Sequence, residues 1–171
     1  HPAKKIWVKT KSGKKKRVVE NKNKNSAKIQ LTQDTATIIN NLSTVCDYGT
    51  KKDSKGYKYT WKGYKLHAAV NDYNIPVAAI VTSASVNDTL VAIPLIRKVE
   101  DRIDNLYYLM DAGYDATAIR AEITNHGKVG LIDLNHRGNK ADTRAFMTHE
   151  KERYGNRSFS ESLFSHLKMQ H

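Results

Sequence analysis

The sequence has almost none of the residues that would cross-link the chain or carry it through a membrane. Cys46 is the one cysteine among 171 residues, so an internal disulfide is excluded. The longest apolar runs, near 75–81 and 90–96, are too short to cross a bilayer, and no signal-peptide pattern precedes them. The composition therefore predicts a soluble, cytoplasmic protein of one domain's length, without a membrane partner.

Acidic residues are scarce at the start of the chain. Residues 1–28 hold eleven Lys or Arg and the single acid Glu20, whereas the rest of the chain is nearly neutral and the whole carries +12. Such a stretch predicts a polyanion partner held by counterion release, and a solvated tail is an equal alternative for its densest part. That densest part is Lys14, Lys15, Lys16 and Arg17.

Hydrophobic periodicity predicts a mixed α/β chain. Near the start, Ser12-Gly13 could turn a hairpin, and Ala27–Leu42 contains a short helix. From Gly63 onward the pattern is two hairpin strands followed by helix, strand, helix, strand and a long final helix. The expected ranges are strands at 6–11, 14–19, 64–70, 75–82, 105–110 and 129–134, and helices at 88–103, 116–126 and from about 144.

The strand after Gly63 alternates apolar and polar side chains, as a half-buried strand does. We expect Tyr64 and Leu66 to face inward and Lys65 and His67 to lie on the polar face, with His67 structural and not a ligand. The segment before it, 50–62, reads as a loop or a strand lead-in. Its lysines could extend a DNA-binding surface.

Asp111 follows the apolar strand 105–110 and precedes Gly113. In an open α/β sheet, functional side chains gather at the carboxyl ends of strands, so Asp111 is a candidate site residue. Asp115 is better placed than Asp111 to cap the next helix. Asp133 also ends a strand.

Tyr154, Arg157, Glu161 and Lys168 form the pattern Y-x2-R-x3-E-x6-K inside the final predicted helix. On one continuous helix these four side chains share a stripe about 60° wide, opposite an apolar face. A carboxylate flanked by two cations and a phenol suits a metal ion beside a phosphodiester. The alternative, favoured by geometry alone, is a solvated surface with a weak Arg157–Glu161 ion pair.

The spacing resembles the Y-R-E-K signature of DDE transposases of bacterial insertion sequences. Three further blocks, in the family's order, look like the same family. They are C-D-Y-G-T-K-K-D-S-K-G from Cys46 with W-K-G-Y-K-L-H from Trp61, T-S-A-S-V-N-D from Thr82, and L-M-D-A-G-Y-D from Leu109.

The resemblance implies a ribonuclease-H-like mixed sheet flanked by helices, with Asp111 as second and Glu161 as third acid of the triad. These acids would hold Mg²⁺ or Mn²⁺ for cleavage and strand transfer. Arg157 and Lys168 would hold phosphates, with Tyr154 near the backbone. The partners would be double-stranded DNA, both transposon ends and target, and a second copy of the chain on DNA, bound at the nucleoid.

One departure from the family limits these expectations. The first triad Asp should end the central strand of the sheet, and no such motif lies upstream of Gly63. The resemblance therefore implies an N-terminally truncated fragment that lacks its first strand and is inactive alone, with a basic N-terminal extension at 1–62 and the catalytic core at 63–171. Either Ile6–Lys11 fills the vacant place or the chain is marginally stable.

Two other functions stay open. A non-catalytic, basic nucleic-acid-binding module of the same fold fits the charge at 1–28 and the incomplete triad. A simple metal-dependent nuclease would cleave without joining a 3′-hydroxyl to target DNA.

Overall fold

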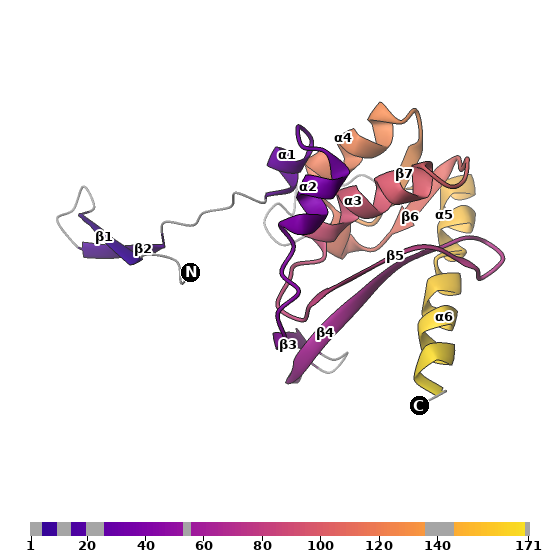
Figure 1. Ribbon diagram of the computed structural model, residues 1–171. Coiled ribbons are helices and arrows are strands. Elements are labelled where there is room, and N and C mark those ends of the chain that lie inside the picture. The colour runs from indigo at the N-terminus through magenta and orange to yellow at the C-terminus, as the bar shows by residue number, and fades with distance from the viewer. Residues whose placement is uncertain (1–4, 10–14, 20–25, 53–55, 136–145, 170–171) are drawn as a thin grey trace.

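The structure is a computed structural model that describes residues 5–9, 15–19, 26–52, 56–135 and 146–169 (Figure 1). It is a mixed α/β fold in which helices flank antiparallel and parallel strands, as predicted for a ribonuclease-H-like chain. The elements are β1 (Lys5–Lys9), β2 (Lys15–Val19), α1 (Ala27–Gln30), α2 (Thr35–Asn40), β3 (Asp47–Lys52), β4 (Lys58–Val70), β5 (Pro76–Ser83), α3 (Thr89–Glu100), β6 (Tyr107–Met110), the 3₁₀ turn η1 (Ala112–Tyr114), α4 (Thr117–Asn125), β7 (Val129–Ile132), α5 (Thr148–Gly155) and α6 (Ser158–Met169).

The described strands form three separate sheets. β3, β4 and β5 make an antiparallel sheet, β6 and β7 a parallel pair, and β1 and β2 an antiparallel hairpin. The hairpin confirms the pairing predicted for the basic start, although its expected turn at Ser12-Gly13 lies outside the described residues. Because β1 pairs only with β2, the idea that Ile6–Lys11 fills a place in the main sheet is wrong.

Most of the segment 50–62, which was predicted to be a loop or a strand lead-in, belongs to the strands β3 and β4. β3 runs antiparallel to the first half of β4, and the second half of β4 pairs with β5. The predicted division between residues 62 and 63 falls inside the continuous strand β4, and the division itself stays a prediction.

The two faces of β4 are the reverse of those predicted. Tyr64 and Leu66 are exposed, whereas His67 is 6% exposed and lies on the inner side. His67 Nε2 makes a 3.0 Å hydrogen bond with Thr82 Oγ1 on β5, so its polarity is satisfied inside the protein. The alternation in the sequence was real, but alternation alone does not say which face is covered.

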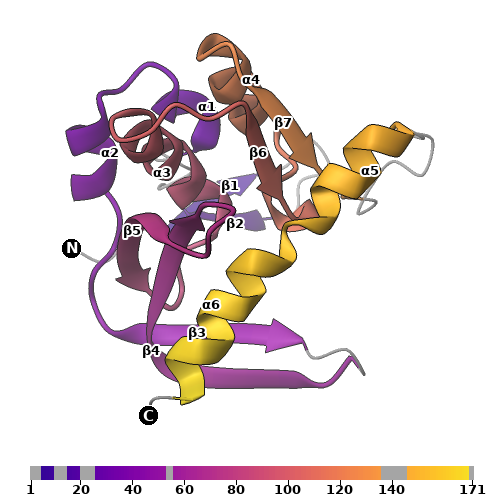
Figure 2. The same ribbon diagram turned by 90° about the vertical axis from the view of Figure 1, so that its right-hand side faces the viewer.

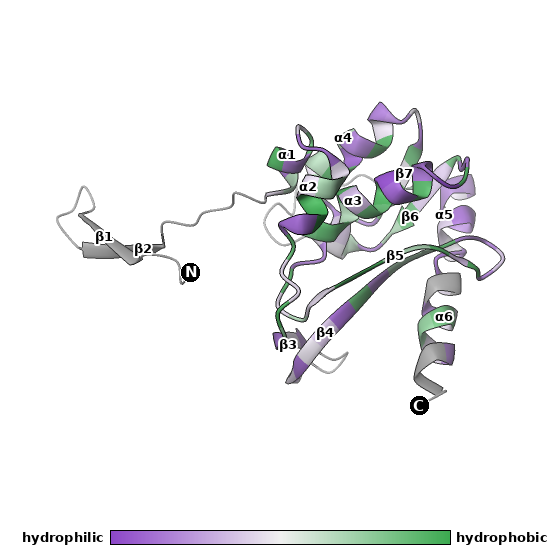
Figure 3. Ribbon diagram, viewed as in Figure 1, coloured by the Kyte–Doolittle hydropathy of each residue, from purple (hydrophilic) through white to green (hydrophobic). Residues whose placement is uncertain are grey.

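The core forms around α3, which packs against β4 and β5 on one side and α4 on the other. Ile93 and Ile96 on α3 meet Ile38 of α2 and Ile119 and Ile123 of α4, all of them buried. Figure 3 shows hydrophobic residues along α3 and the neighbouring strands. Pro94 lies inside α3 and is buried, and the helix ends at Glu100, three residues before the predicted end.

A buried ion pair joins α3 to two other elements. Arg97 Nε donates to Glu122 Oε1 of α4 at 2.5 Å, and Arg97 Nη1 donates to the carbonyl of Gln33 between α1 and α2 at 2.5 Å. Glu122 is only 3% exposed. Burial by itself would raise the pKa of Glu122, but the hydrogen bonds and charge of Arg97, with a smaller effect of His126, hold it below its ordinary value.

The end of the chain forms two helices where the sequence predicted one. α5 ends at Gly155 and α6 begins at Ser158, with Asn156 and Arg157 between them. Figure 2 shows α6 running in front of β3 and β4, and a hydrogen bond from Asn74 Nδ2 to Ser162 Oγ at 3.2 Å ties α6 to the β4–β5 turn. Within the described residues, every helix is too short or too polar to span a bilayer.

We expect Glu122→Gln to lower the free energy of unfolding by about 3 kcal/mol at pH 7, because it leaves the Arg97 charge buried without its partner. Chemical denaturation measures this, and Glu152→Gln on the exposed side of α5 is the control, with a change below about 0.5 kcal/mol.

The pair should also make stability depend on pH. Since the folded pKa of Glu122 is lowered, its contribution is complete above the ordinary value near 4.5 and is lost as pH falls through the folded value. The unfolding free energy of the wild type should therefore fall more steeply than that of Glu122→Gln between about pH 5 and pH 3. Equal slopes would contradict the assignment.

Candidate active site

Two carboxylates lie side by side at the carboxyl end of the parallel pair. β6 and β7 are in register from Tyr107 opposite Val129 to Met110 opposite Ile132. Asp111 directly follows β6, and Asp133 directly follows β7. The amide of Asp133 donates to the carbonyl of Met110 at 3.3 Å. Asp111 thus stands where the sequence predicted it, and Asp133 is its neighbour, a proximity that the sequence did not reveal.

Asp111 is exposed and is held by the turn that follows it. Its Oδ1 accepts a 2.8 Å hydrogen bond from the amide of Gly113, so Asp111 caps η1. The prediction that capping falls to Asp115 is wrong, since α4 begins after Ala116. Asp115 instead forms a 2.9 Å ion pair with Arg120.

Tyr154 fixes α5 against the end of β6. Its hydroxyl donates to the carbonyl of Met110 at 3.1 Å, directly before Asp111, and its ring lies 4.9 Å from that of Phe146. A hydrogen bond between segments 44 residues apart positions the C-terminal helices relative to the strand ends. Tyr154 therefore touches the protein's own backbone.

Glu161 projects from the first turn of α6. Its Oε1 accepts from Arg157 Nη2 at 3.0 Å, which is the i, i+4 ion pair predicted as the alternative to a functional site. The Glu161 side chain is 64% exposed, and such exposed pairs contribute about 0–1 kcal/mol. The pair therefore orients Glu161 without making it unavailable to a ligand. Arg157 also lies over the Tyr154 ring, 5.7 Å from its centre.

Three carboxylates act on the Tyr154 hydroxyl. Burial raises the pKa of Tyr154 above its ordinary value near 10, and the nearby Arg157 charge opposes that rise. The charges of Asp133, Asp111 and Glu161 each raise the pKa of Tyr154 further. Asp111, Asp133 and Glu161 are therefore close enough to Tyr154 for their charges to act on its hydroxyl, even though the helix between Tyr154 and Glu161 is interrupted.

A second cluster lies near this place. Lys65 Nζ donates to Asp88 Oδ1 at 2.9 Å and to the carbonyl of Val86 at 2.6 Å. Burial lowers the pKa of His67, Asp88 opposes the shift, and Lys65 adds to it. Tyr114 connects the cluster to the strand end, because burial first, then Asp88 and Asp111, raise the pKa of its hydroxyl. Asp88 precedes α3 but makes no side-chain capping bond, and its partner is Lys65.

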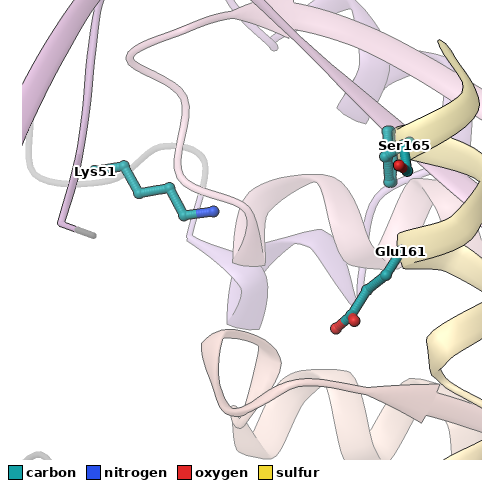
Figure 4. A pocket seen from close by; sticks show the side chains of 4 residues that line it. Lys51, Glu161 and Ser165 are labelled. Atoms are coloured by element: carbon teal, nitrogen blue, oxygen red, sulfur yellow. The ribbon is translucent and has the colours of Figure 1, made fainter. Parts of the chain in front are cut away.

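An open cavity of about 470 Å³ lies between α6 and β3 (Figure 4). Its lining residues are Lys51, Glu161, Phe164 and Ser165. Lys51 enters from the strand side and Glu161 from the helix side, and both point into the same space. The sequence predicts Lys51 only as one of several lysines of 50–62 that could extend a DNA-binding surface, because that segment reads as a loop or a strand lead-in.

The side chains of the other predicted site residues lie outside what the structure describes. Lys14 lies outside the described residues, and Lys15, Lys16 and Arg17 lie on β2 without described side chains. Lys168 is on α6, also without a described side chain. Their DNA contacts stay predictions.

The carboxylates of Asp111 and Glu161 are hard oxygen donors of the kind that Mg²⁺ and Mn²⁺ prefer. The part of the chain that the structure describes contains no group of three or more His, Cys, Asp or Glu placed to hold a metal ion. The donors therefore fit such an ion in kind, and the set is incomplete within the described residues.

Comparison with known proteins gives one match. Residues 41–170 match the family model described as a transposase DDE domain. No curated protein and no solved structure matches the chain.

We expect Tyr154→Phe to lower the free energy of unfolding by about 1 kcal/mol, because the variant loses the hydrogen bond to the Met110 carbonyl. Chemical denaturation measures the effect. Tyr73→Phe, at a side chain that is 79% exposed, is the matched control and should change little. Equal losses in the two variants would show that the bond does not hold α5 in place.

Proposed function

Because the chain belongs to the transposase DDE domain family, we propose that it serves in DNA transposition, through metal-dependent phosphodiester cleavage and strand transfer. Asp111 and Glu161 are the proposed second and third acids. The observation that supports the proposal is geometric: the Tyr154 hydroxyl binds the Met110 carbonyl directly before Asp111, and Arg157, three residues after Tyr154, pairs with Glu161. Cleavage and joining need carboxylates gathered at one place beside bound DNA.

The proposed reaction has two steps. Water attacks the scissile phosphorus, the P–O3′ bond breaks, and the 3′-oxygen leaves as a hydroxyl. That 3′-hydroxyl then attacks a phosphorus of target DNA, forms a new P–O3′ bond and expels the target's own 3′-oxygen. Divalent cations, held by Asp111, Glu161 and a third acid, would stabilise charge on the attacking and leaving oxygens.

Around that chemistry this chain's side chains bind and orient DNA. Arg157 would hold a phosphate with its planar guanidinium, as would Lys168 with a point charge. Tyr154 holds the end of α5, which precedes Arg157 and α6, against β6. Two copies would meet on the paired transposon ends in the cytoplasm, at the nucleoid, as the resemblance to insertion-sequence transposases suggests.

The first test is nicking of plasmid DNA that carries the transposon ends, with Mg²⁺ or Mn²⁺. We expect the 171-residue chain alone to be inactive, and an extended chain that includes a strand ending in the first Asp to nick. Asp111→Asn and Glu161→Gln should each reduce nicking at least about 100-fold, because charge stabilisation of several kcal/mol is lost.

Asp72→Asn and Glu152→Gln are the matched controls, since both side chains are exposed outside the site. Nicking that survives Asp111→Asn and Glu161→Gln would defeat the assignment. Nicking without joining of a 3′-hydroxyl end would indicate a nuclease instead.

The second test concerns the basic segment. Replacing Lys14, Lys15, Lys16 and Arg17 by Gln should lower the salt slope of log K for duplex DNA by about 3 to 4, because each phosphate contact contributes about 0.9. Fluorescence anisotropy of labelled duplex DNA at several salt concentrations measures this. An unchanged slope would show that the segment does not contact DNA.

The non-catalytic alternative has its own signature. It draws support from the basic charge of residues 1–28 and from the lack of a first-Asp motif upstream of Gly63. A chain that binds DNA equally with and without EDTA, and that never nicks even when extended, would favour that alternative.

A further inference from the structure

The outer half of β4 and all of β3 form a two-stranded ribbon that continues past the β4–β5 pair. In its register Lys51 is opposite Tyr59, and Gly49 is opposite Trp61. Opposed residues of antiparallel strands project from the same face. These four residues therefore form one side of the ribbon, which we name the cleft face, while Tyr48, Thr50, Thr60 and Lys62 project from the other.

The cleft face is turned toward α6. Lys51 lines the same cavity as Glu161, Phe164 and Ser165, and its ammonium group points into that cavity from the wall opposite the carboxylate (Figure 4). A cation and an anion that share an open cavity without forming an ion pair leave space between them for a third group. A phosphodiester offers oxygens that an ammonium group binds.

Lys51 differs from the nearby lysines of β4 in what it contacts. Lys62 lies over the Tyr48 ring at 5.9 Å on the other face, and Lys65 is held by Asp88 and the carbonyl of Val86. Lys51 is exposed and has no ion pair or hydrogen bond with any residue that the structure describes. Its charge is therefore available to a polyanion.

The ribbon holds Lys51 in place by packing beside it. The Trp61 indole lies across β3 where Gly49 has no side chain, since a Cβ at 49 would stand 2.5 Å from the ring. Tyr59, directly opposite Lys51, lies 5.8 Å from Trp61 between ring centres. An aromatic surface next to a free cation also matches the way proteins bind single-stranded or distorted nucleic acid ends.

We propose that Lys51 binds a backbone phosphate of the DNA strand that lies in front of Glu161, so that the ribbon forms one wall of the DNA channel and α6 the other. The inference rests on the proposed function. It adds a DNA-binding residue from a strand that carries none of the Y-x2-R-x3-E-x6-K pattern.

The test measures binding of fluorescein-labelled duplex DNA in EDTA, on a Glu161→Gln background, so that no chemistry is needed. Lys51→Gln should lower the salt slope of log K by about 1, and Lys51→Arg should keep it, because the charge remains. Lys98→Gln is the matched control on α3, outside both the basic stretch 1–28 and the ribbon, and should leave the slope unchanged.

A second measurement places the contact. A benzophenone amino acid at position 51 should crosslink to labelled DNA on irradiation, whereas the same amino acid at position 98 on α3 should not. Denaturation midpoints show whether each variant is folded, and the crosslink keeps the inference testable if Lys51→Gln is not.

The outcomes separate the two proposals. An unchanged slope in Lys51→Gln together with no crosslink from position 51 overturns the inference, and so does a wild-type chain that does not bind DNA. Neither result alters the dependence of nicking on Asp111 and Glu161. Conversely, nicking that survives Asp111→Asn and Glu161→Gln removes the proposed function, even if Lys51 contacts DNA.

Discussion

The arrangement depends on α3, which holds two sheets in one body. β3–β4–β5 and β6–β7 are separate sheets, so backbone hydrogen bonding between strands does not place them relative to each other. α3 does so through its buried Ile93 and Ile96, and through Arg97, which reaches both α4 and the α1–α2 connection. In a continuous sheet, hydrogen bonds between neighbouring strands would fix the relative position of these strands. Here the packing of α3 fixes it.

The geometry of the candidate site therefore also depends on how α3 packs. Asp111 follows the parallel pair, and Lys51 belongs to the antiparallel sheet. Glu161 belongs to α6, which contacts the β4–β5 turn through Ser162, while Tyr154 on the preceding α5 contacts the end of β6. The geometry among these three residues is therefore set by packing between elements. A change in how α3 sits would shift charges relative to one another without altering any of their local hydrogen bonds.

The features of the fold and the site that depend on a local sequence pattern could be predicted from the sequence. Asp111 was placed correctly because an apolar run before an Asp-x-Gly turn leaves few alternatives. Which face of β4 is buried could not be predicted, because an alternating pattern is equally consistent with either face inward. The hydrogen-bond partner of the buried His67 is Thr82, which lies on another strand. The interruption at Asn156 was missed because hydrophobic periodicity continues across it. Lys51 could be predicted only as one of several lysines of 50–62, because its position opposite Glu161 arises from tertiary packing.

The contact between Gly49 and Trp61 has a consequence for how this protein can be varied. A methyl group at 49 would stand 2.5 Å from the indole and 2.8 Å from the Ala84 carbonyl, so it would displace both the ring and the strand while leaving every charge in the chain as it is. Gly49→Ala and a neutral residue at 51 would thus perturb the same wall in two independent ways, one steric and one electrostatic. The shape of the opening and its potential are separate variables in this fold, and selection or engineering could adjust either one alone.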